Sequence, residues 1–181
     1  LMLRVGEALA ALSARRRMPV CFKASFDKAN RSRGGGQRGP GLDQGLRALE
    51  RVPDLRLDIV GTGPEAPRLR TLAQALAVTD RVRWYGEYPD EDIPRRMAES
   101  HFLVLPSVTS EEMFGLAAVE AMAAGRPVIT TDLPSGVREV NSHGHTGLVV
   151  PLRDPDALAQ AMSKLAANPE LRAKMGAAGR S

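Results

Sequence analysis

The sequence predicts an α/β protein with a doubly wound parallel sheet, a three-layer α/β/α arrangement of the Rossmann-like kind. From residue 53 onward, short apolar segments alternate with longer segments of helical periodicity, as in parallel sheets that are covered on both faces. Turn sequences rich in glycine and proline separate these segments. The 181 residues, of which 43% are hydrophobic and 25% charged, have the composition of a globular domain.

The elements can be assigned in order along the chain. Apolar spacing predicts a helix over residues 3–17, and a loop rich in Gly, Arg and Ser follows at 27–41. Further helices are expected over 42–51, 64–77, 90–100, 154–168 and 169–179, with one more that begins near Phe114 or Gly115. Short apolar runs predict strands over 19–26, 55–61, 81–86, 101–107, 127–131 and 146–151.

Composition excludes several classes of protein. Cys21 is the single cysteine, which rules out a disulfide framework and favours a reducing cytoplasmic setting. No apolar run reaches the roughly 20 residues that span a bilayer, and no secretory signal is present. The sequence begins with Leu1, so we expect a fragment. Aromatic residues make up only 4%, which argues against nucleic-acid binding because few bases could stack.

The carboxyl ends of the predicted strands define one rim. Ligands of open α/β sheets bind at this edge, near the point where the strand order reverses. The segments "GTGPE", with Gly61 and Gly63, "PSVTSEEMFG" and "TDLPSG" follow predicted strands and should lie along it. Ser135 and Gly136 in the last segment either line a cleft or form a plain turn.

The segment "SVTSEEMFGLAAVEAM" has the features of an anion site. A polar loop leads into a helix whose free N–H groups and positive dipole end would face the rim. Gly115 permits close approach of the backbone. Glu120 lies about one and a half turns inside the helix, where its carboxylate can accept hydrogen bonds from sugar hydroxyls, and Glu112 lies in the preceding loop.

This segment and its surroundings resemble the donor-binding half of retaining GT-B glycosyltransferases, the family that includes sucrose and glycogen synthases. "GTGPE", "RVRWYGEYPDEDIPRRMAES", "EAMAAGRPVI" and "HGHTGLVVPLRDPDALA" match, so the resemblance covers residues 52–181. The family's E-x7-E motif falls on Glu112 and Glu120. The resemblance assigns Glu112 to the transferred sugar as the catalytic residue, the amides of Phe114, Gly115 and Leu116 to the diphosphate, and Glu120 to the ribose.

Residues 1–51 resemble a different family, the 3-deoxy-D-manno-octulosonate 8-phosphate synthases, through "KASFDKANRSR" and "RGPGL". This segment carries a charge of +7 against −3 for residues 52–181, and two lysines with an arginine suit phosphate. The resemblance makes five residues candidate phosphate-binding residues: Lys23, Lys28, Asn30, Arg31 and Ser32. A barrel synthase needs several strands for its active site, so synthase activity is not expected. The chain is interpreted as a hybrid, engineered or joined in error, in which the foreign segment replaces the first βα unit.

The expected function is recognition of a nucleotide diphosphate sugar, with a UDP- or GDP-sugar as donor, no cofactor and no metal. Asp154 precedes Pro155 and is expected to cap a helix instead of binding a metal. The family's N-terminal acceptor domain lies outside the sequence, so the chain alone should be inactive. Peripheral membrane association of the full-length enzyme and self-association are further expected interactions. The alternatives are a folded hybrid without a ligand and a phosphoenolpyruvate- or phosphate-binding remnant.

Overall fold

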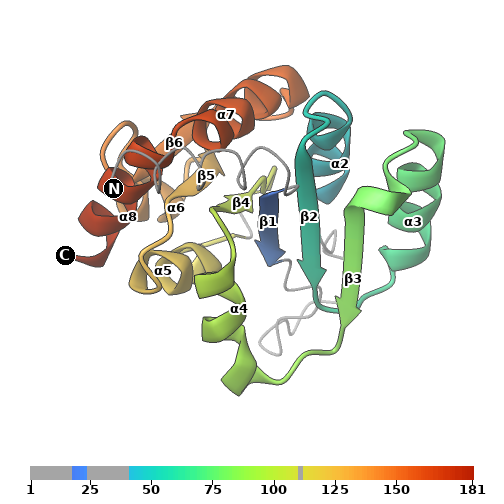
Figure 1. Ribbon diagram of the computed structural model, residues 1–181, viewed down its shortest axis with the longest axis horizontal. Coiled ribbons are helices and arrows are strands. Elements are labelled where there is room, and N and C mark those ends of the chain that lie inside the picture. Colours follow the sequence, from blue (N-terminus) through green and yellow to red (C-terminus); the bar gives the residue numbers. More distant parts are fainter. Residues whose placement is uncertain (1–17, 24–40, 110–111) are drawn as a thin grey trace, which may run out of the picture.

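A computed structural model describes residues 18–23, 41–109 and 112–181. These residues form a single parallel sheet with helices on both faces (Figure 1). Within these residues the strands run in the order β3-β2-β1-β4-β5-β6. The strands are β1 (Met18–Lys23), β2 (Leu55–Val60), β3 (Val82–Gly86), β4 (Leu103–Leu105), β5 (Val128–Thr131) and β6 (Gly147–Val150). Every neighbouring pair is parallel, so the predicted fold class is confirmed.

The helices fall in the intervals between the strands, except α7 and α8, which follow β6. They are α2 (Leu42–Glu50), α3 (Ala66–Ala75), α4 (Ile93–Glu99), α5 (Leu116–Ala123), α6 (Val137–Val140), α7 (Pro155–Ala167) and α8 (Pro169–Arg180). Two 3-10 turns, η1 (Thr79–Arg81) and η2 (Asp90–Asp92), precede β3 and α4. The helix predicted over residues 3–17 lies outside the described residues. No helix in the described part of the chain is long and apolar enough to cross a membrane.

The chain builds the sheet outward in two directions from its centre. It runs from β1 through β2 to β3, then crosses back through η2 and α4 to β4 and continues to β5 and β6 (Figure 1). The strand order therefore reverses between β1 and β4. Because all the strands are parallel, the loops that follow β2, β4 and β5 meet at one edge, which is the place where doubly wound sheets bind ligands.

Two hydrophobic clusters hold the layers together. The larger cluster joins α2, α3 and α7 to the sheet through fully buried residues such as Leu46, Leu57 and Leu165. The smaller cluster joins α4 and α5 to the sheet through Met97 and Leu105, among others. Successive side chains of a strand point to opposite faces of the sheet, so that alternate residues belong to different clusters.

Several element boundaries differ from the predicted ones. The third helix begins at Ala66, with Pro67 in its first turn, instead of at Pro64. Residues Asp90–Asp92 form a 3-10 turn, so α4 begins only at Ile93. The short helix α6 and the turn η1 were not predicted, because neither is long enough to display helical periodicity.

Candidate functional site

The loop between β4 and α5 lies at the reversal point of the sheet. It starts after Leu105, and α5 begins at Leu116, with Gly115 as its N-cap residue in the left-handed region at φ 66°. A Cβ at Gly115 would lie 2.9 Å from Leu105 Cδ2 and 3.3 Å from Val137 Cγ2. Both the backbone conformation and the surrounding packing therefore require glycine here. The helix starts one or two residues later than predicted.

The N-terminus of α5 offers backbone donors at the rim. The N–H groups of Ala118 and Val119 donate to the Gly115 carbonyl, at 2.7 and 3.3 Å. Among the described residues, no backbone oxygen accepts from the N–H of Leu116 or Ala117. N–H groups without a backbone acceptor in the described part of the chain, together with the positive end of the helix dipole, favour an anion at this position.

Glu112 lies against the same helix start. Its side chain is half-buried, and its Oε1 accepts a hydrogen bond from the Gly115 N–H at 3.2 Å. The carboxylate is therefore directed at the beginning of α5, and it satisfies one of the N–H groups that precede the helix. The sequence prediction placed Glu112 in a loop before the helix, which the structure confirms; its hydrogen bond to Gly115 was not foreseen.

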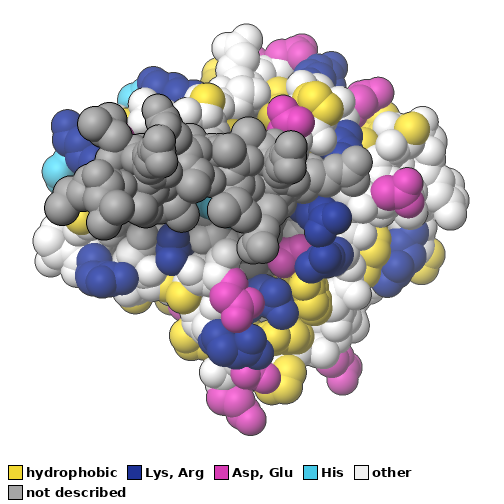
Figure 2. Space-filling view, viewed as in Figure 1, with side chains coloured by type: hydrophobic (Ala, Val, Ile, Leu, Met, Phe, Trp, Pro, Cys, Tyr) yellow, Lys and Arg dark blue, Asp and Glu magenta, His cyan; other side chains and the backbone are white. Residues whose placement is uncertain are grey.

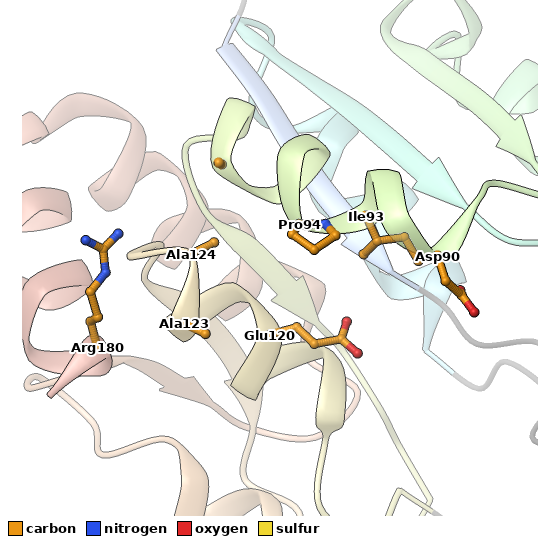
Figure 3. A pocket seen from close by; sticks show the side chains of 8 residues that line it. Asp90, Ile93, Pro94, Glu120, Ala123, Ala124 and Arg180 are labelled. Atoms are coloured by element: carbon orange, nitrogen blue, oxygen red, sulfur yellow. The ribbon is translucent and has the colours of Figure 1, made fainter.

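Glu120 lies on the exposed side of α5 and lines a pocket of about 760 Å³. The pocket is formed by η2 and α4 on one side and by α5 and the end of α8 on the other; its lining residues include Asp90, Ile93 and Pro94. In Figure 3 the Glu120 carboxylate points toward the end where Asp90 lies, and Arg180 lies at the opposite end. Glu112 is not among the residues that line this pocket.

Large apolar side chains surround the start of α5 on the solvent side. Met113, Phe114, Leu116 and Val119 are 64%, 59%, 65% and 44% exposed. Phe114 also borders Gly136, because a Cβ at Gly136 would lie 2.9 Å from Phe114 Cδ1. The predicted phosphate-site segment is therefore in contact with the loop that follows β5.

The predicted glycine turn after β2 lies at the same edge of the sheet, on the other side of β1. Gly61 has φ 123° and donates its N–H to the Gly86 carbonyl at 2.9 Å. The carbonyl of Gly63 accepts from the Ala66 N–H at 3.1 Å, which closes the turn that leads into α3. The bond between Gly61 and Gly86 links the ends of β2 and β3. The roles of Gly61 and Gly63 in ligand binding stay predictions.

The candidate phosphate residues of the first segment are mostly outside the described residues. Lys23 is the last residue of β1, where its backbone pairs with Val60 at the carboxyl edge of the sheet. Lys28, Asn30, Arg31 and Ser32 lie outside the described ranges. Their proposed role therefore stays a prediction.

The aspartate at the start of α7 has the predicted capping role. Asp154 Oδ1 accepts from the N–H groups of Asp156 and Ala157, at 3.1 and 2.9 Å. His143 Nδ1 accepts from the Val149 N–H at 2.9 Å, so it links a turn to β6. No cluster of three or more His, Cys, Asp or Glu side chains that could hold a metal occurs in the ranges that the structure describes.

A polar network beside the pocket was not predicted. Arg96 of α4 lies 3.9 Å from Asp58 Oδ2 and 3.2 Å from Glu99 Oε2. Its guanidinium also covers the ring of Tyr85 at 4.5 Å and donates to Tyr88 Oη at 3.3 Å. This network, Asp58, Tyr85, Tyr88 and Arg96, joins β2, β3 and α4 to the loop that leads to the pocket. Figure 2 shows basic and acidic side chains gathered over this region.

Asp58 is the buried centre of this network. It is 4% exposed, and its Oδ2 accepts from Tyr85 Oη at 3.4 Å. Burial raises the pKa of Asp58 above its usual value, while the nearby charges of Arg96, Arg83 and Arg56 and the Tyr85 hydroxyl act in the opposite direction. An aspartate inside the otherwise apolar part of "LRLDIV" was the sequence signal for such a site.

Comparisons with curated proteins find glycosyltransferases among the relatives of this chain. The D-rhamnosyltransferase WbpZ of Pseudomonas aeruginosa is 37% identical over 136 residues, which cover 75% of this chain and 35% of WbpZ. A GDP-mannose-dependent alpha-(1-6)-phosphatidylinositol monomannoside mannosyltransferase of Mycolicibacterium smegmatis is 36% identical over 149 residues, covering 77% of this chain and 39% of the relative. The chain thus spans less than two fifths of the length of either relative.

Solved structures show the same fold. Sucrose-phosphate synthase from Thermosynechococcus elongatus superposes with a TM-score of 0.76 at 28% identity, over 97% of this chain and 43% of that chain. The Anabaena protein HepE, solved in complex with UDP and glucose, superposes with a TM-score of 0.77 at 21% identity, over 97% of this chain and 46% of HepE. The second likeness shows the fold alone.

A protein-family comparison identifies the chain directly. The model for "Glycosyl transferases group 1" matches residues 37–181. The match includes α2, which the sequence analysis had placed in the segment that resembles the octulosonate 8-phosphate synthases. That second resemblance and the boundary at residue 52 stay predictions. The chain belongs to the group 1 glycosyltransferases and has the α/β fold of their GT-B domains.

Proposed function

We propose that this chain is the donor-binding domain of a retaining glycosyltransferase and binds a nucleotide diphosphate sugar, with UDP or GDP as the nucleotide. The observation that carries the proposal is the arrangement at the start of α5. Glu112 accepts a hydrogen bond from the N-cap residue Gly115, no backbone oxygen of the described residues accepts from the N–H groups of Leu116 and Ala117, and Glu120 lies one turn further on. Because the chain belongs to a family of glycosyltransferases, we expect this anion to be the diphosphate of a sugar nucleotide.

Each part of the donor has a matching group in this site. The diphosphate would accept hydrogen bonds from the amides at the start of α5, where the helix dipole favours negative charge. The amide of Gly115 is already bonded to Glu112, so we assign the phosphate contacts mainly to Leu116 and Ala117. This assignment moves the phosphate site one residue further along than the sequence prediction of Phe114, Gly115 and Leu116.

Glu120 would bind the ribose. Its carboxylate has two oxygens that can each accept a hydrogen bond from a vicinal hydroxyl group. The pocket beside it has apolar walls from Ile93 and Pro94, which suits the face of a nucleobase. Glu112, at the opposite end of the phosphate site, would then lie near the transferred sugar and act as the catalytic residue of the full-length enzyme.

Transfer itself would require more than this chain. The relatives are more than twice as long as the matched region, and we propose that the remainder supplies the acceptor site. The chain alone would bind donor without transferring sugar, and the transfer would be retaining and independent of metal. Cytoplasmic location, peripheral membrane association and self-association belong to the same set of predictions.

The test is a calorimetric titration of the whole chain with UDP and with GDP. Removing a charged acceptor of two hydroxyl groups should cost about 2 kcal/mol, so Glu120→Ala should weaken nucleotide binding by roughly thirtyfold. Glu170→Ala is the matched control, because Glu170 is also an exposed helical glutamate but lies in the first turn of α8. Equal affinity in the Glu120→Ala and Glu170→Ala chains would contradict the assignment of Glu120. No binding by the unaltered folded chain would favour a hybrid without a ligand.

A further inference from the structure

The loop that carries Glu112 packs closely against two glycines from other parts of the chain. A Cβ at Gly41, which precedes α2, would lie 1.8 Å from the Pro106 carbonyl oxygen. A Cβ at Gly136, which precedes α6, would lie 2.6 Å from the Met113 carbonyl oxygen. The loop between β4 and α5 therefore touches the starts of two other helices, at Pro106 near its beginning and at Met113 near its end.

Gly136 is required for space and not for its backbone conformation. Its φ and ψ are −58° and −10°, which every amino acid adopts easily. A methyl group there would meet the Met113 carbonyl oxygen at 2.6 Å and the Phe114 ring at 2.9 and 3.1 Å. The ring of Phe114 could rotate away, but a backbone carbonyl can move only with its chain. A side chain at position 136 would therefore displace the backbone at Met113.

Such a displacement would reach the start of α5 directly. Met113 follows Glu112, whose hydrogen bond to the Gly115 N–H spans three residues and is 3.2 Å long. Val137, the neighbour of Gly136, is buried and packs against Gly115: its Cγ2 would lie 3.3 Å from a Cβ at that glycine. The start of α6 thus forms the surface on which residues 113–115 rest.

We propose that Gly136 is a positioning residue for donor binding. Its missing side chain lets residues 113–115 rest on α6, and this contact sets the position of Glu112 relative to the amides of Leu116 and Ala117. Gly136 does not need to touch the donor for this role. The inference depends on the proposed function, because it concerns the geometry of the same sugar-nucleotide site.

The test compares two glycine-to-alanine substitutions in the whole chain, titrated with UDP-glucose and with GDP-mannose. Gly136→Ala should weaken binding of the preferred donor by roughly tenfold. The control is Gly144→Ala, in the turn before the edge strand β6. Gly144 has φ 79°, and a Cβ at this position would have no atom of the described residues within 4 Å. Its substitution should therefore lower the melting temperature and leave donor affinity unchanged.

A double-mutant cycle with Glu112→Ala separates positioning from general destabilisation. If Gly136 acts through the Glu112 loop, Gly136→Ala should cost less than about threefold in affinity once Glu112 is already alanine, since residues that act through one another are not additive. Full additivity, or an unchanged affinity in Gly136→Ala, would overturn the inference. Failure of the unaltered chain to bind either donor would instead overturn the proposed function.

Val137→Ala tests the same surface if the Gly136→Ala chain does not fold. This substitution removes the methyl groups that pack against Gly115 and introduces no clash. The inference predicts weaker donor binding and the same non-additivity with Glu112→Ala. Donor affinity equal to that of the unaltered chain, in a folded Val137→Ala protein, would overturn it.

Discussion

Along β2, the two faces of the sheet bury different kinds of side chain. On the face of α2, α3 and α7, β2 contributes Leu55, Leu57 and Ile59 to a continuous apolar cluster. On the face of α4, the same strand contributes Asp58, which contacts Arg96. One strand therefore serves two purposes: its apolar side stabilises the domain, and its polar side is linked to the loop and helix that form the pocket beside Glu120.

This difference between the apolar and the polar side of β2 predicts what substitutions on each face will affect. Apolar packing is stabilising in proportion to the area that it buries, whereas buried charges stabilise only when their partners are in place. We therefore expect substitutions on the first face to affect stability and those on the second face to affect both stability and the shape of the pocket.

The largest effect should come from the apolar face. Leu165 of α7 is fully buried, and Leu165→Ala should lower the free energy of unfolding by about 3 kcal/mol, since it leaves a cavity. Leu152→Ala is the control, because Leu152 is 38% exposed and its substitution should cost far less. Urea denaturation measures both. A similar loss in the two variants would mean that α7 repacks around the missing side chain and that this face is less tightly packed than the burial of Leu165 indicates.

A smaller effect is expected from the polar face. Arg96→Met keeps most of the aliphatic length of the side chain but removes the guanidinium beside Asp58, Tyr85 and Tyr88. Loss of this partner should lower the free energy of unfolding by about 1.5 kcal/mol, and it should also weaken nucleotide binding, because α4 carries Ile93 and Pro94 in the pocket wall.

The neighbouring arginine provides the control for that prediction. Arg95 pairs with Asp92 and Glu99 on the exposed side of α4, where ion pairs contribute little. Arg95→Met should leave both stability and nucleotide affinity within experimental error, as judged by urea denaturation and calorimetry. If Arg95→Met and Arg96→Met lost equal stability and equal nucleotide affinity, the total charge of α4 would matter and the network around Asp58 would not.

The smallest effect concerns the pH dependence of stability. Because burial raises the pKa of Asp58 above 3.8, the folded chain holds this proton more tightly than the unfolded chain does. The contribution of Asp58 is therefore most favourable below pH 3.8 and is lost as the pH rises through the pKa of the folded state. Asp58→Asn removes this dependence, so the variant should gain stability relative to the unaltered chain as the pH rises from about 3.5 to about 7.

Urea denaturation of both chains at several pH values checks this sign. The useful quantity is the difference between the two unfolding free energies, since other carboxylates titrate equally in both. If the Asp58→Asn chain instead lost stability relative to the unaltered chain as the pH rises, the charges of Arg96, Arg83 and Arg56 would have a larger effect on the pKa of Asp58 than its burial does.

Much of the fold could be predicted from the sequence because it depends on local patterns. The apolar runs at β2, β4 and β5 and the helical spacing of α7 and α8 predicted those elements, and alternation of the two kinds predicted a parallel sheet. Helix starts were less well predicted: η2 replaces the first turn of the expected helix, and α5 begins after Gly115. These boundaries depend on contacts with distant residues, such as Leu105 and Val137 against Gly115.

The sequence by itself determined the fold class, the position of the rim and the places of Glu112 before α5 and Glu120 within it, while the assignment of these glutamates to a donor stays a prediction. It could do so because strand and helix periods, turn residues and the E-x7-E spacing are all local in the chain. Only the tertiary structure showed that Gly136 touches Met113, that Asp58 contacts Arg96, and that Glu120 shares a pocket with Asp90 and Ile93. Each of these contacts joins residues that lie on different elements far apart in the chain, and such pairs are brought together by the packing of the helices on the sheet and not by any local pattern.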